Sequence, residues 1–533
     1  MADAIRIRAL GGVGRFGANS LLVEDLVARA AIVVDCGVRL LVDEPFGFDF
    51  ALPDLGALSA LDGELVGYAV THAHEDHIGA LPYALERRVA PVFATSFSAR
   101  MVERRFVRSQ RPLPVLREVR FHEPVKAGPF ELRWVPVSHS IPDAAAVAVR
   151  TRAGTLVHSG DFRVDEDPVL GLPTDLPGLA ALGDEGVLCL LSDSTGADLP
   201  GKNPGERSVM GPLREAMQQA RGRVVVATFS SHVSRLKVLE GLCQELGRRL
   251  CILGRGMRGV VELAQRHGLL SPDVISDEGQ ISGVARERLC LAVTGSQGEL
   301  GSALFRLAHE RHGALSLEPG DQVIFSSRIV PGSELSVLEV IDRLRALGVE
   351  VLDGRGGRHV SGHGFQEDLE TLLAATRPRF FVALHGAPRQ LLAHRALARR
   401  MGVPDERVLP LESGGALVFD DDGAPRLEEG PHHEPFARGP HVIEQPGPTL
   451  SSRRRMAAGG VLVVVLRDEG VKLAGRALDP ALDEEALLEL AGGAADALFA
   501  GAPVDEALLT RLRRMDLRLP EVVVVDARTE AAP

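Results

Sequence analysis

The residues best suited to chemistry lie in one short stretch, THAHEDHIGA. His72 and His74 are two residues apart at the end of an expected strand, so an extended backbone points both imidazoles to the same side. Asp76 and His77 follow where a helix is expected to begin, and they can turn toward the same point. Three imidazoles and one carboxylate at this spacing form a donor set that suits zinc and similar borderline metals. The stretch therefore predicts a metal site.

Elements on either side of this stretch must hold it in place. The first 70 residues alternate short β-branched runs with Gly and Asp turns, which predicts a strand meander. A helical pattern follows at 78–88, and helical and loop patterns mix from 93 to 120. Later, GTLVHSGDF and GVLCLLSDST each look like a strand whose end carries an acidic residue, Asp161 in the first and Asp193 in the second. Strand ends of this kind are where layered α/β folds commonly present a site.

The chain divides into segments of different pattern. Residues 1–205 and 353–430 share the short-strand style, while 206–352 alternate helices with buried strands, which predicts an inserted parallel sheet covered by helices. Residues 431–450, rich in Pro, Gly and His, predict a linker, and 451–533 predict a small α/β domain. The predicted fold class is α/β.

The composition limits the class of protein. The 533 residues include 45% apolar and 25% charged side chains, as in a globular protein of several domains. The formal charge of −12 gives no overall basic field, so an anionic substrate must be held by a local patch. The five cysteines form no CxxC pair, and their odd number argues against a disulfide framework. The longest apolar runs are far shorter than the roughly 20 residues of a membrane span, and the N-terminus lacks the pattern of a secretory signal. We therefore expect a soluble cytoplasmic protein with no membrane partner.

Several motifs together resemble a known family. The HxHxDH spacing resembles the signature of the metallo-β-lactamase fold, and VSHSIPDA and HSGDFR look like its later ligand segments. HVSGHGFQEDL, FFVALHGAPRQLLAH, LLSDSTGADLPG, VTGSQGE and the opening GGVGRFGAN resemble motifs of the β-CASP nucleases, most closely ribonuclease J. The resemblance follows the family's order over nearly the whole chain. It implies a metallo-β-lactamase αββα sandwich, an inserted β-CASP domain and a small C-terminal α/β domain.

The resemblance also implies a set of ligands for two divalent metal ions, zinc in the first place and manganese as the alternative. One metal would be held by His72, His74 and His139, the second by Asp76, His77 and His385, with Asp161 between the two. Asp76, Asp193 and His363 are the implied catalytic residues. His363 would stabilise the transition state or protonate the leaving oxygen, and Asp193 would orient a metal-bound or histidine partner.

Other positions are implied to hold the substrate, single-stranded RNA. These are Ser231, His232, Arg235, Gly295, Ser296, Ser361, Gly362 and His363. Small residues at strand-to-helix turns expose backbone N–H groups to an anion, which is what a phosphate requires. Gly and Ser are also ordinary turn residues, so this interpretation depends on the family's order.

A further candidate surface is an arginine stripe. If Phe97–Arg108 is helical, Arg100, Arg104 and Arg108 lie one turn apart on one face. The stripe is either a solvated face or a rim that guides RNA. Aromatic residues make up only 4% of the chain, which argues against long base-stacking tracks and favours contacts to phosphate and sugar.

The chain departs from the family pattern at four positions. Ala73 and Ala80 stand where Gly is usual, Arg15 stands where an acidic residue is usual, and Ala387 replaces the Glu that commonly follows the last ligand. None of them removes a metal ligand. Asp35 matches an acidic position near the metals, although an Asp at such a place is also a plain turn former.

The implied function is a ribonuclease that degrades or matures RNA by a metal-activated water. The family's pattern implies 5′-to-3′ exonucleolysis, endonucleolysis, or both, together with a homodimer and protein partners in RNA decay. Two alternatives remain open: a metallohydrolase of the same fold that acts on DNA or on a small ester or lactone, and an RNA-binding subunit without catalysis. The amount of bound metal would separate the non-catalytic RNA-binding subunit from the ribonuclease and from the other metallohydrolases.

Overall fold

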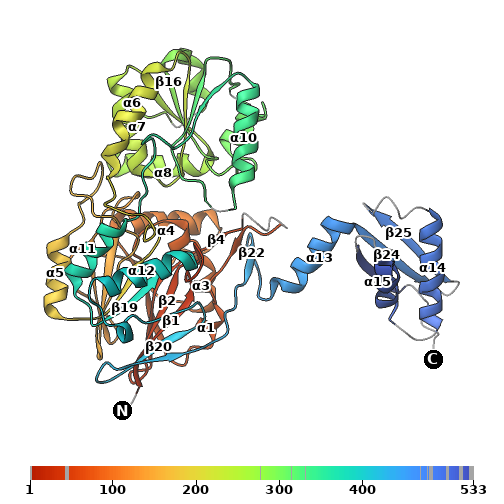
Figure 1. Ribbon diagram of the computed structural model, residues 1–533, viewed down its shortest axis with the longest axis horizontal. Coiled ribbons are helices and arrows are strands. Elements are labelled where there is room, and N and C mark those ends of the chain that lie inside the picture. Colours follow the sequence, from red (N-terminus) through yellow and green to blue (C-terminus); the bar gives the residue numbers. More distant parts are fainter. Residues whose placement is uncertain are drawn as a thin grey trace. The chain divides into compact units, whose positions relative to one another are not determined.

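The computed structural model contains two compact units, residues 1–43 with 49–442, and residues 443–533 with 44–48 (Figure 1). The structure describes residues 3–41, 47–275, 278–313, 315–330, 332–467, 470–476, 478, 484–499, 503–514 and 520–526. Within these ranges no helix is both long enough and apolar enough to cross a bilayer.

The first unit is built around two facing sheets. One sheet has the order β21-β20-β1-β2-β3-β6-β7-β8, and the other has the order β19-β13-β12-β11-β10-β9. The first sheet contains β1 (Asp3–Gly11), β2 (Ser20–Asp25), β3 (Ala30–Cys36), β6 (Glu64–Ala69), β7 (Val92–Ala94), β8 (Leu116–Glu118), β20 (Ala416–Asp420) and β21 (Pro425–Glu428). The second contains β9 (Val125–Ala127), β10 (Phe130–Pro136), β11 (Ala145–Thr151), β12 (Gly154–His158), β13 (Val187–Asp193) and β19 (Phe380–Leu384). The predicted strand meander is confirmed, because β1, β2 and β3 pair antiparallel in sequence order.

The apolar side chains between the sheets explain their pairing. Ile5, Ile7 and Ile32 from the first sheet share one buried cluster with Trp134 and Val147 from the second. Burial of apolar surface of this kind is the main force that holds two sheets face to face. The sandwich is therefore closed from within by residues that the strand alternation supplies.

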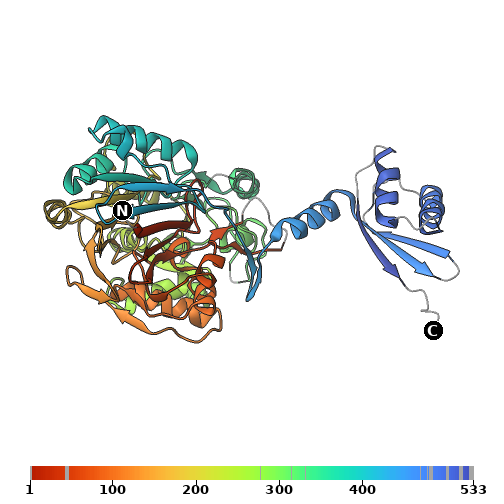
Figure 2. The same cartoon turned by 90° about the horizontal axis from the view of Figure 1, so that it is seen from below.

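Helices cover both outer faces of the sandwich. Figure 2 shows later helices (teal) on one side of the strands and early ones (orange) on the other. They are α1 (Gly56–Ser59), α2 (Glu75–Ile78), α3 (Leu81–Arg87) and α4 (Ser96–Arg108) by the first sheet, and α5 (Leu176–Glu185), α11 (Gln366–Thr376) and α12 (Pro388–Arg400) by the second. The helix predicted at 78–88 is confirmed as α3, which begins only at Leu81. It is separate from α2, and Pro82, which has no N–H to donate to Ile78, lies in its first turn.

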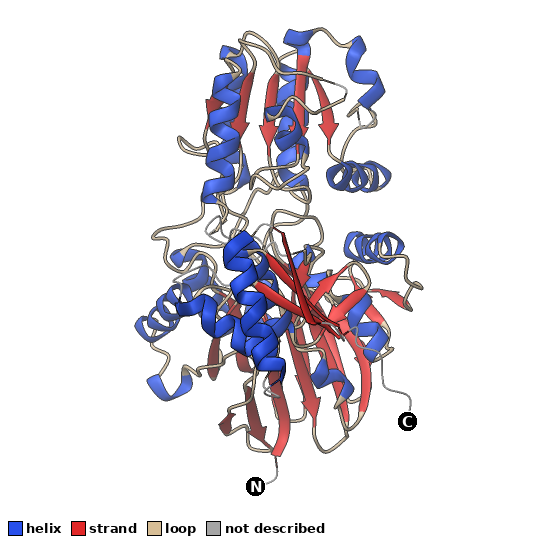
Figure 3. Cartoon of the chain, turned by 90° about the vertical axis from the view of Figure 1, so that its right-hand side faces the viewer, coloured by secondary structure: helices blue, strands red, loops and turns tan. Residues whose placement is uncertain are grey.

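The inserted domain is a parallel sheet with helices on both faces (Figure 3). Its strand order is β15-β16-β14-β17-β18, and every pair is parallel. The strands are β14 (Val224–Ala227), β15 (Arg249–Leu253), β16 (Leu289–Val293), β17 (Gln322–Phe325) and β18 (Glu350–Leu352). The helices are α6 (Met210–Gln219), α7 (Val233–Glu245), α8 (Arg255–Arg266), α9 (Ala303–Ala308) and α10 (Glu334–Ala346), with 3-10 turns at Glu206–Val209, Glu278–Gly283 and Arg286–Arg288. Buried runs such as VVVA fit a sheet covered on both sides.

The remaining elements follow the sandwich. Residues 431–450, for which the sequence predicts a linker, contain β22 (Phe436–Arg438), β23 (His441–Ile443) and the start of α13 (Pro446–Gly459); β22 belongs to a small sheet with β5 (Phe50–Ala51) and β4 (Arg39–Leu40). A 3-10 turn lies at Asp405–Arg407. The second unit continues with β24 (Val461–Arg467), β25 (Gly470–Arg476), α14 (Glu484–Phe499), α15 (Val504–Arg514) and β26 (Glu521–Asp526), and its sheet order is β25-β24-β26. The exact domain limits stay a prediction.

A buried ion cluster lies where the chain enters the inserted domain. Glu206 is fully buried; its carboxylate accepts a hydrogen bond from Arg235 Nε (2.6 Å) and lies 3.3 Å from His232 Nε2 and 3.6 Å from Arg163. Burial alone would raise the pKa of Glu206, but these cationic and polar neighbours outweigh it and hold the pKa below its ordinary value. The cluster joins the sandwich, through Arg163, to the inserted domain, through Arg235.

We predict that Glu206→Gln destabilises the protein by about 3–5 kcal/mol in urea unfolding, because it leaves buried cations without their carboxylate. The difference from the wild type should be present above about pH 5 and shrink as the pH falls through the lowered pKa of Glu206, where the wild-type carboxyl is itself neutral. Glu245→Gln, which breaks a solvent-exposed pair with Arg214, should leave the unfolding midpoint nearly unchanged. Equal effects of the two substitutions would contradict this interpretation.

Candidate metal centre

Seven side chains converge at one edge of the sandwich, each from the loop or helix that follows a strand. Because the strands of both sheets end at this edge, residues far apart in sequence meet there. His72 and His74 follow β6, and Asp76 and His77 lie in α2; His139 follows β10, Asp161 follows β12 and His385 follows β19. These seven are the residues that the family resemblance implies as metal ligands, and the structure brings them together.

The first group of donors surrounds a single point. His74 Nδ1 lies 3.2 Å from His72 Nε2 and 3.2 Å from His139 Nε2. Asp161 Oδ2 lies 3.6 Å from His72 Nε2 and 3.9 Å from His139 Nε2. Donors at about 2.0–2.1 Å from a tetrahedral zinc ion are roughly 3.3 Å apart, so these separations fit one metal ion among three imidazoles and a carboxylate.

The second group shares Asp161 with the first. Asp161 Oδ2 lies 3.3 Å from His77 Nε2, and Asp161 Oδ1 lies 2.9 Å from His385 Nδ1. Asp76 Oδ2 completes the group at 3.7 Å from His77 Nε2 and 3.5 Å from His385 Nε2. These donors also fit a divalent metal, and Asp161 is placed to serve both groups.

The electrostatics of the first group suit metal binding. Burial lowers the pKa of His72 and His139 well below the ordinary value and lowers that of His74 to about 4. These imidazoles are therefore neutral at pH 7, which is the form that binds a metal.

The second group holds its charges differently. Burial would lower the pKa of His77 and His385, but Asp161 and other carboxylates outweigh it and raise both above the ordinary value. The same histidines hold the pKa of Asp161 and Asp76 below its usual range against the opposing effect of burial. Since a ligating histidine must lose a proton, metal binding at this group should release protons.

A chain of hydrogen bonds behind the ligands fixes their orientation. Asp35 Oδ2 accepts a hydrogen bond from His77 Nδ1 (2.7 Å), and the same carboxylate accepts from the Thr71 N–H (2.8 Å) and Oγ1 (2.7 Å). Thr71 Oγ1 also lies 3.0 Å from His72 Nδ1. Each ring thus directs its other nitrogen toward the donor group. Asp35 therefore lies beside His77, one of the predicted ligands.

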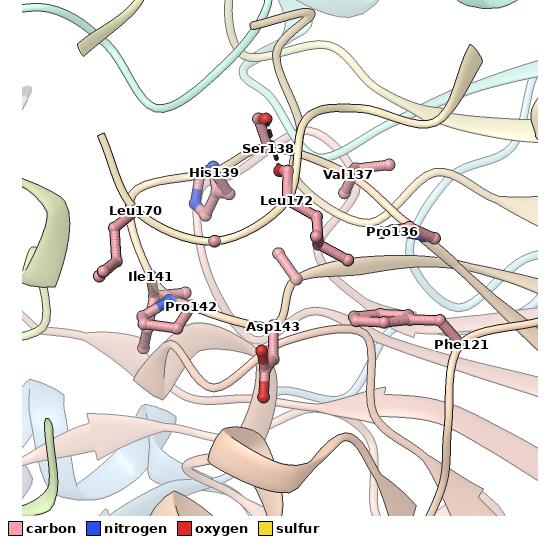
Figure 4. A pocket seen from close by; sticks show the side chains of 12 residues that line it. Phe121, Pro136, Val137, Ser138, His139, Ile141, Pro142, Asp143, Leu170 and Leu172 are labelled. Carbon is pink, nitrogen blue, oxygen red and sulfur yellow. Dashed lines mark hydrogen bonds between the residues drawn. The ribbon is translucent and has the colours of Figure 1, made fainter. Parts of the chain in front are cut away.

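Residues around His139 hold it from behind. Its Nδ1 donates to the Gly362 carbonyl (2.8 Å), and Ser138 Oγ donates to the Leu172 carbonyl (3.1 Å), as Figure 4 shows. A small pocket in the same figure lies between this segment and the loop with Leu170 and is lined on its far side by Phe121. Trp134, the chain's one tryptophan, donates from Nε1 to the Val70 carbonyl (2.9 Å), which ties the strand before His139 to the strand before His72.

His363 and Asp193 stand beside the second group. His363 Nδ1 lies 2.8 Å from Asp193 Oδ2, and Asp193 Oδ1 lies 3.3 Å from His385 Nδ1. Burial would lower the pKa of His363, but Asp193 and Asp161 outweigh it and raise that pKa. Asp193 is therefore positioned to orient both histidines.

The predicted substrate-binding residues divide into two places. Ser361, Gly362 and His363 lie in the loop at the metal centre, whereas the others lie at the carboxyl edge of the inserted sheet. Ser231 is half-buried there; His232 and Arg235 are buried and face Glu206, and Arg235 also donates to the Ser326 carbonyl (2.9 Å). Direct contact of these two side chains with RNA stays a prediction.

Gly295 and Ser296 follow β16 at that same edge. Gly295 has a φ of +114°, and a Cβ there would lie 2.3 Å from Ser302 Oγ, so the turn requires glycine. Ser296 is buried beside it. The backbone of this turn, with the start of α7, is the part of the edge best suited to an anion.

The arginine stripe lies on α4. The predicted helix is α4; Arg100 pairs with Glu103, Arg104 donates to the Gly256 carbonyl of the inserted domain (3.3 Å) and Arg108 pairs with Glu75. A role of the stripe in guiding RNA stays a prediction.

The four positions that depart from the family pattern have the following surroundings. Arg15 pairs with Glu434 (3.1 Å), Ala73 and Ala80 are buried, and Ala387 donates its N–H to Gln390 Oε1 (2.9 Å).

Two polar residues that touch the predicted ligands could not be identified from the sequence. Asn19 Nδ2 lies 3.0 Å from His77 Nε2 and 3.4 Å from Asp76 Oδ2, and Thr71 bridges Asp35 and His72. Asn19 closes the GGVGRFGAN loop, and a lone amide after a glycine loop was the available signal. Thr71 directly precedes the first predicted ligand, His72. Because a hydroxyl at the end of a strand can have many roles, this position alone did not identify Thr71 as part of the site.

Three sequence models of protein families match the chain. The metallo-β-lactamase superfamily matches residues 13–196, the β-CASP domain of ribonuclease J matches 221–344, and the RNA specificity domain of Zn-dependent metallo-hydrolases matches 357–408. The ribonuclease J of Mycobacterium tuberculosis is 37% identical over 480 residues, which cover 89% of this chain and 85% of that protein. The ribonuclease J of Helicobacter pylori is 34% identical over 418 residues, which cover 77% of this chain and 60% of that protein. A crystal structure of an Enterococcus faecalis protein of unknown function shares the fold, with a TM-score of 0.53 and 16% identity, and covers 78% of this chain and all of that one.

We predict that Asp35→Asn weakens metal binding by about 10- to 100-fold, because the amide no longer stabilises the His77 Nδ1–H. Asn tolerates the φ of +58° at this position, so the backbone should not change. A competition titration with a chelating dye measures the affinity. Asp54→Asn, which alters a half-buried turn carboxylate outside the donor groups, is the control and should bind metal as the wild type does. Equal affinity of Asp35→Asn and the wild type would refute the role of Asp35.

Proposed function

The chain belongs to the ribonuclease J family, and from that membership we propose that this metal-dependent ribonuclease hydrolyses single-stranded RNA with two metal ions, as a 5′-to-3′ exonuclease and as an endonuclease. The observation that carries the proposal is the pair of donor groups that share Asp161, with His363 and Asp193 at their side. The RNA specificity match covers 357–408, the segment that supplies His363 and His385. Zinc is the proposed metal and manganese the alternative.

The donor groups would hold the two ions, which when bound lower the pKa of a water and neutralise the charge of a phosphodiester. The role of the protein is then to orient and to move protons. His363 Nδ1 faces the Asp193 carboxylate, so Nε2 is the atom left to carry a proton toward the leaving oxygen. The raised pKa of His363 favours that protonated form.

RNA would lie between the metal centre and the inserted sheet. The turns at Ser231 and Gly295–Ser296 would hold phosphates through backbone N–H groups and hydroxyls. The carboxyl ends of β14, β16 and β17 meet here, which is where parallel sheets commonly bind ligands. Because such contacts reach phosphate and sugar, little sequence preference is expected. Dimerisation, protein partners in RNA decay and a cytoplasmic location stay predictions from the family resemblance.

The direct test uses 5′-labelled, 5′-monophosphorylated single-stranded RNA and matched DNA, in Zn²⁺ or Mn²⁺. The wild type should release labelled mononucleotide from RNA, and His77→Ala should lose at least about 100-fold of that activity together with about one metal equivalent. The control is His122→Ala, which alters a half-exposed histidine outside the donor groups.

Other results would change the proposal in distinct ways. Internal fragments alone would retain the nuclease and remove the exonuclease. Preferential cleavage of DNA would change the substrate. Two bound metals without cleavage of either polymer would favour a small-molecule hydrolase, and no metal with no cleavage would favour a binding subunit.

We also predict that Ser231→Ala raises KM for the RNA by about 2- to 10-fold and leaves kcat within about 2-fold, because it removes one hydrogen bond to a phosphate far from the reacting bond. Initial rates at varied RNA concentration give both constants. Ser59→Ala, at an exposed helix end, is the matched control. An unchanged KM would remove Ser231 from the RNA-binding surface.

A further inference from the structure

Three side chains hold the loop Ser361–His363 by donating hydrogen bonds to its backbone carbonyls. The Gly362 carbonyl accepts from His139 Nδ1 (2.8 Å). The Ser361 carbonyl accepts from Arg163 (3.1 Å) and from Asn203 Nδ2 (3.0 Å), and the His363 carbonyl accepts from Asn203 Nδ2 (2.7 Å). One amide group therefore fastens the residues on both sides of Gly362.

The orientation of the Asn203 side chain is set by its own contacts. Its Oδ1 accepts a hydrogen bond from the Gly205 N–H (2.9 Å), so the amide nitrogen must point at the two carbonyls. Its backbone N–H donates to Asp368 Oδ2 (2.8 Å), a carboxylate that also accepts from the Phe365 N–H (2.8 Å). Asn203 is only 3% exposed. A buried amide with all of these partners has one available conformation.

Asn203 also lies at a particular place in the chain. It belongs to the segment that leaves the sandwich for the inserted domain, three residues before Glu206, whereas the loop Ser361–His363 belongs to the segment that returns. Glu206 binds Arg235 of the inserted domain, so the outgoing segment is fixed at both of these points. The position of His363 thus depends on a contact between the two crossing segments.

We propose that Asn203 is a positioning residue for His363: its amide holds the backbone of the loop so that the imidazole meets Asp193 beside the donor groups. The proposal rests on the proposed function for its effect on catalysis but not for its effect on the loop. Two hydrogen bonds from a single buried group to the backbone of a loop restrict that loop, and such support is what precise placement of a catalytic side chain requires.

Two substitutions of Asn203 test the proposal. Asn203→Ala removes both hydrogen bonds without adding charge, and Asn203→Asp keeps the shape but places a carboxylate against two carbonyl oxygens. Each should lower kcat on the RNA by about 10- to 100-fold, because the reacting geometry is displaced. Any rise in KM should be smaller than the loss of kcat, because the predicted phosphate contacts at Ser231 and Gly295–Ser296 are unchanged. Metal content should equal that of the wild type. Gln366→Glu, which removes one amide donor from the Ala197 carbonyl (3.0 Å) nearby, is the matched control and should keep the wild-type kcat.

A double-mutant cycle separates positioning from general structure. In a His363→Ala background, Asn203→Ala should change kcat less than about 2-fold, since the residue that it positions is gone. Full additivity of the two losses, or a loss of bound metal in Asn203→Ala, would overturn the proposal.

Hydrogen exchange supplies a readout that does not need activity. In metal-free protein, amides of the peptide over 358–368 should exchange at least about 10-fold faster in Asn203→Ala than in the wild type, and not in Gln366→Glu. Unchanged exchange in that peptide would overturn the proposal even if the protein cleaved no RNA. Absence of cleavage by the wild type, in contrast, would refute the proposed function alone.

Discussion

The buried carboxylate of Asp161 is the constraint on which the site depends. Its side chain is 3% exposed, and nitrogens of His72, His77, His139 and His385 lie 2.9–3.9 Å from its oxygens. A buried charge is costly unless cations or hydrogen bonds compensate it. Here the compensation comes from histidines, of which the first group is held neutral and the second cationic. Divalent metals between these donors would satisfy the carboxylate and the imidazoles together.

Much of the fold can be understood as the means of bringing these groups to one point. Two sheets share an apolar core, so their strand ends meet along one edge, and Trp134 ties the strands that precede His72 and His139. Asp35 and Thr71 contact Nδ1 of His77 and of His72, so that Nε2 of each ring faces the donor groups. The chain passes into the inserted domain and returns from it close to His363. Hydrogen bonds of Glu206 and Asn203 hold these two connecting segments in place. The residues that fasten these crossings therefore lie close to the predicted catalytic residue His363.

The HxHxDH spacing is a local pattern whose chemistry predicts a metal site, whereas His139, Asp161 and His385 were implied by the family resemblance; the structure brings all of these side chains together. The sequence also predicted the parallel inserted sheet from the alternation of helices and buried strands. It did not predict the break before Pro82, where the apolar spacing of a helix continues although a backbone donor is missing. Nor could it assign Asn19, Asn203 or Glu206, because their roles depend on partners as distant as His363 and Arg235. Arg235 shows the same limit: its place in the motif favours a phosphate contact, while the structure pairs it with a buried carboxylate.

If Asp161 serves two metal ions at once, anomalous diffraction from crystals grown with Mn²⁺ or Zn²⁺ should show both ions. We expect two peaks about 3.5–4 Å apart, one beside His72, His74 and His139, the other beside Asp76, His77 and His385, with Asp161 oxygens next to both. A single peak at saturating metal, or two peaks of which only one contacts Asp161, would contradict this expectation.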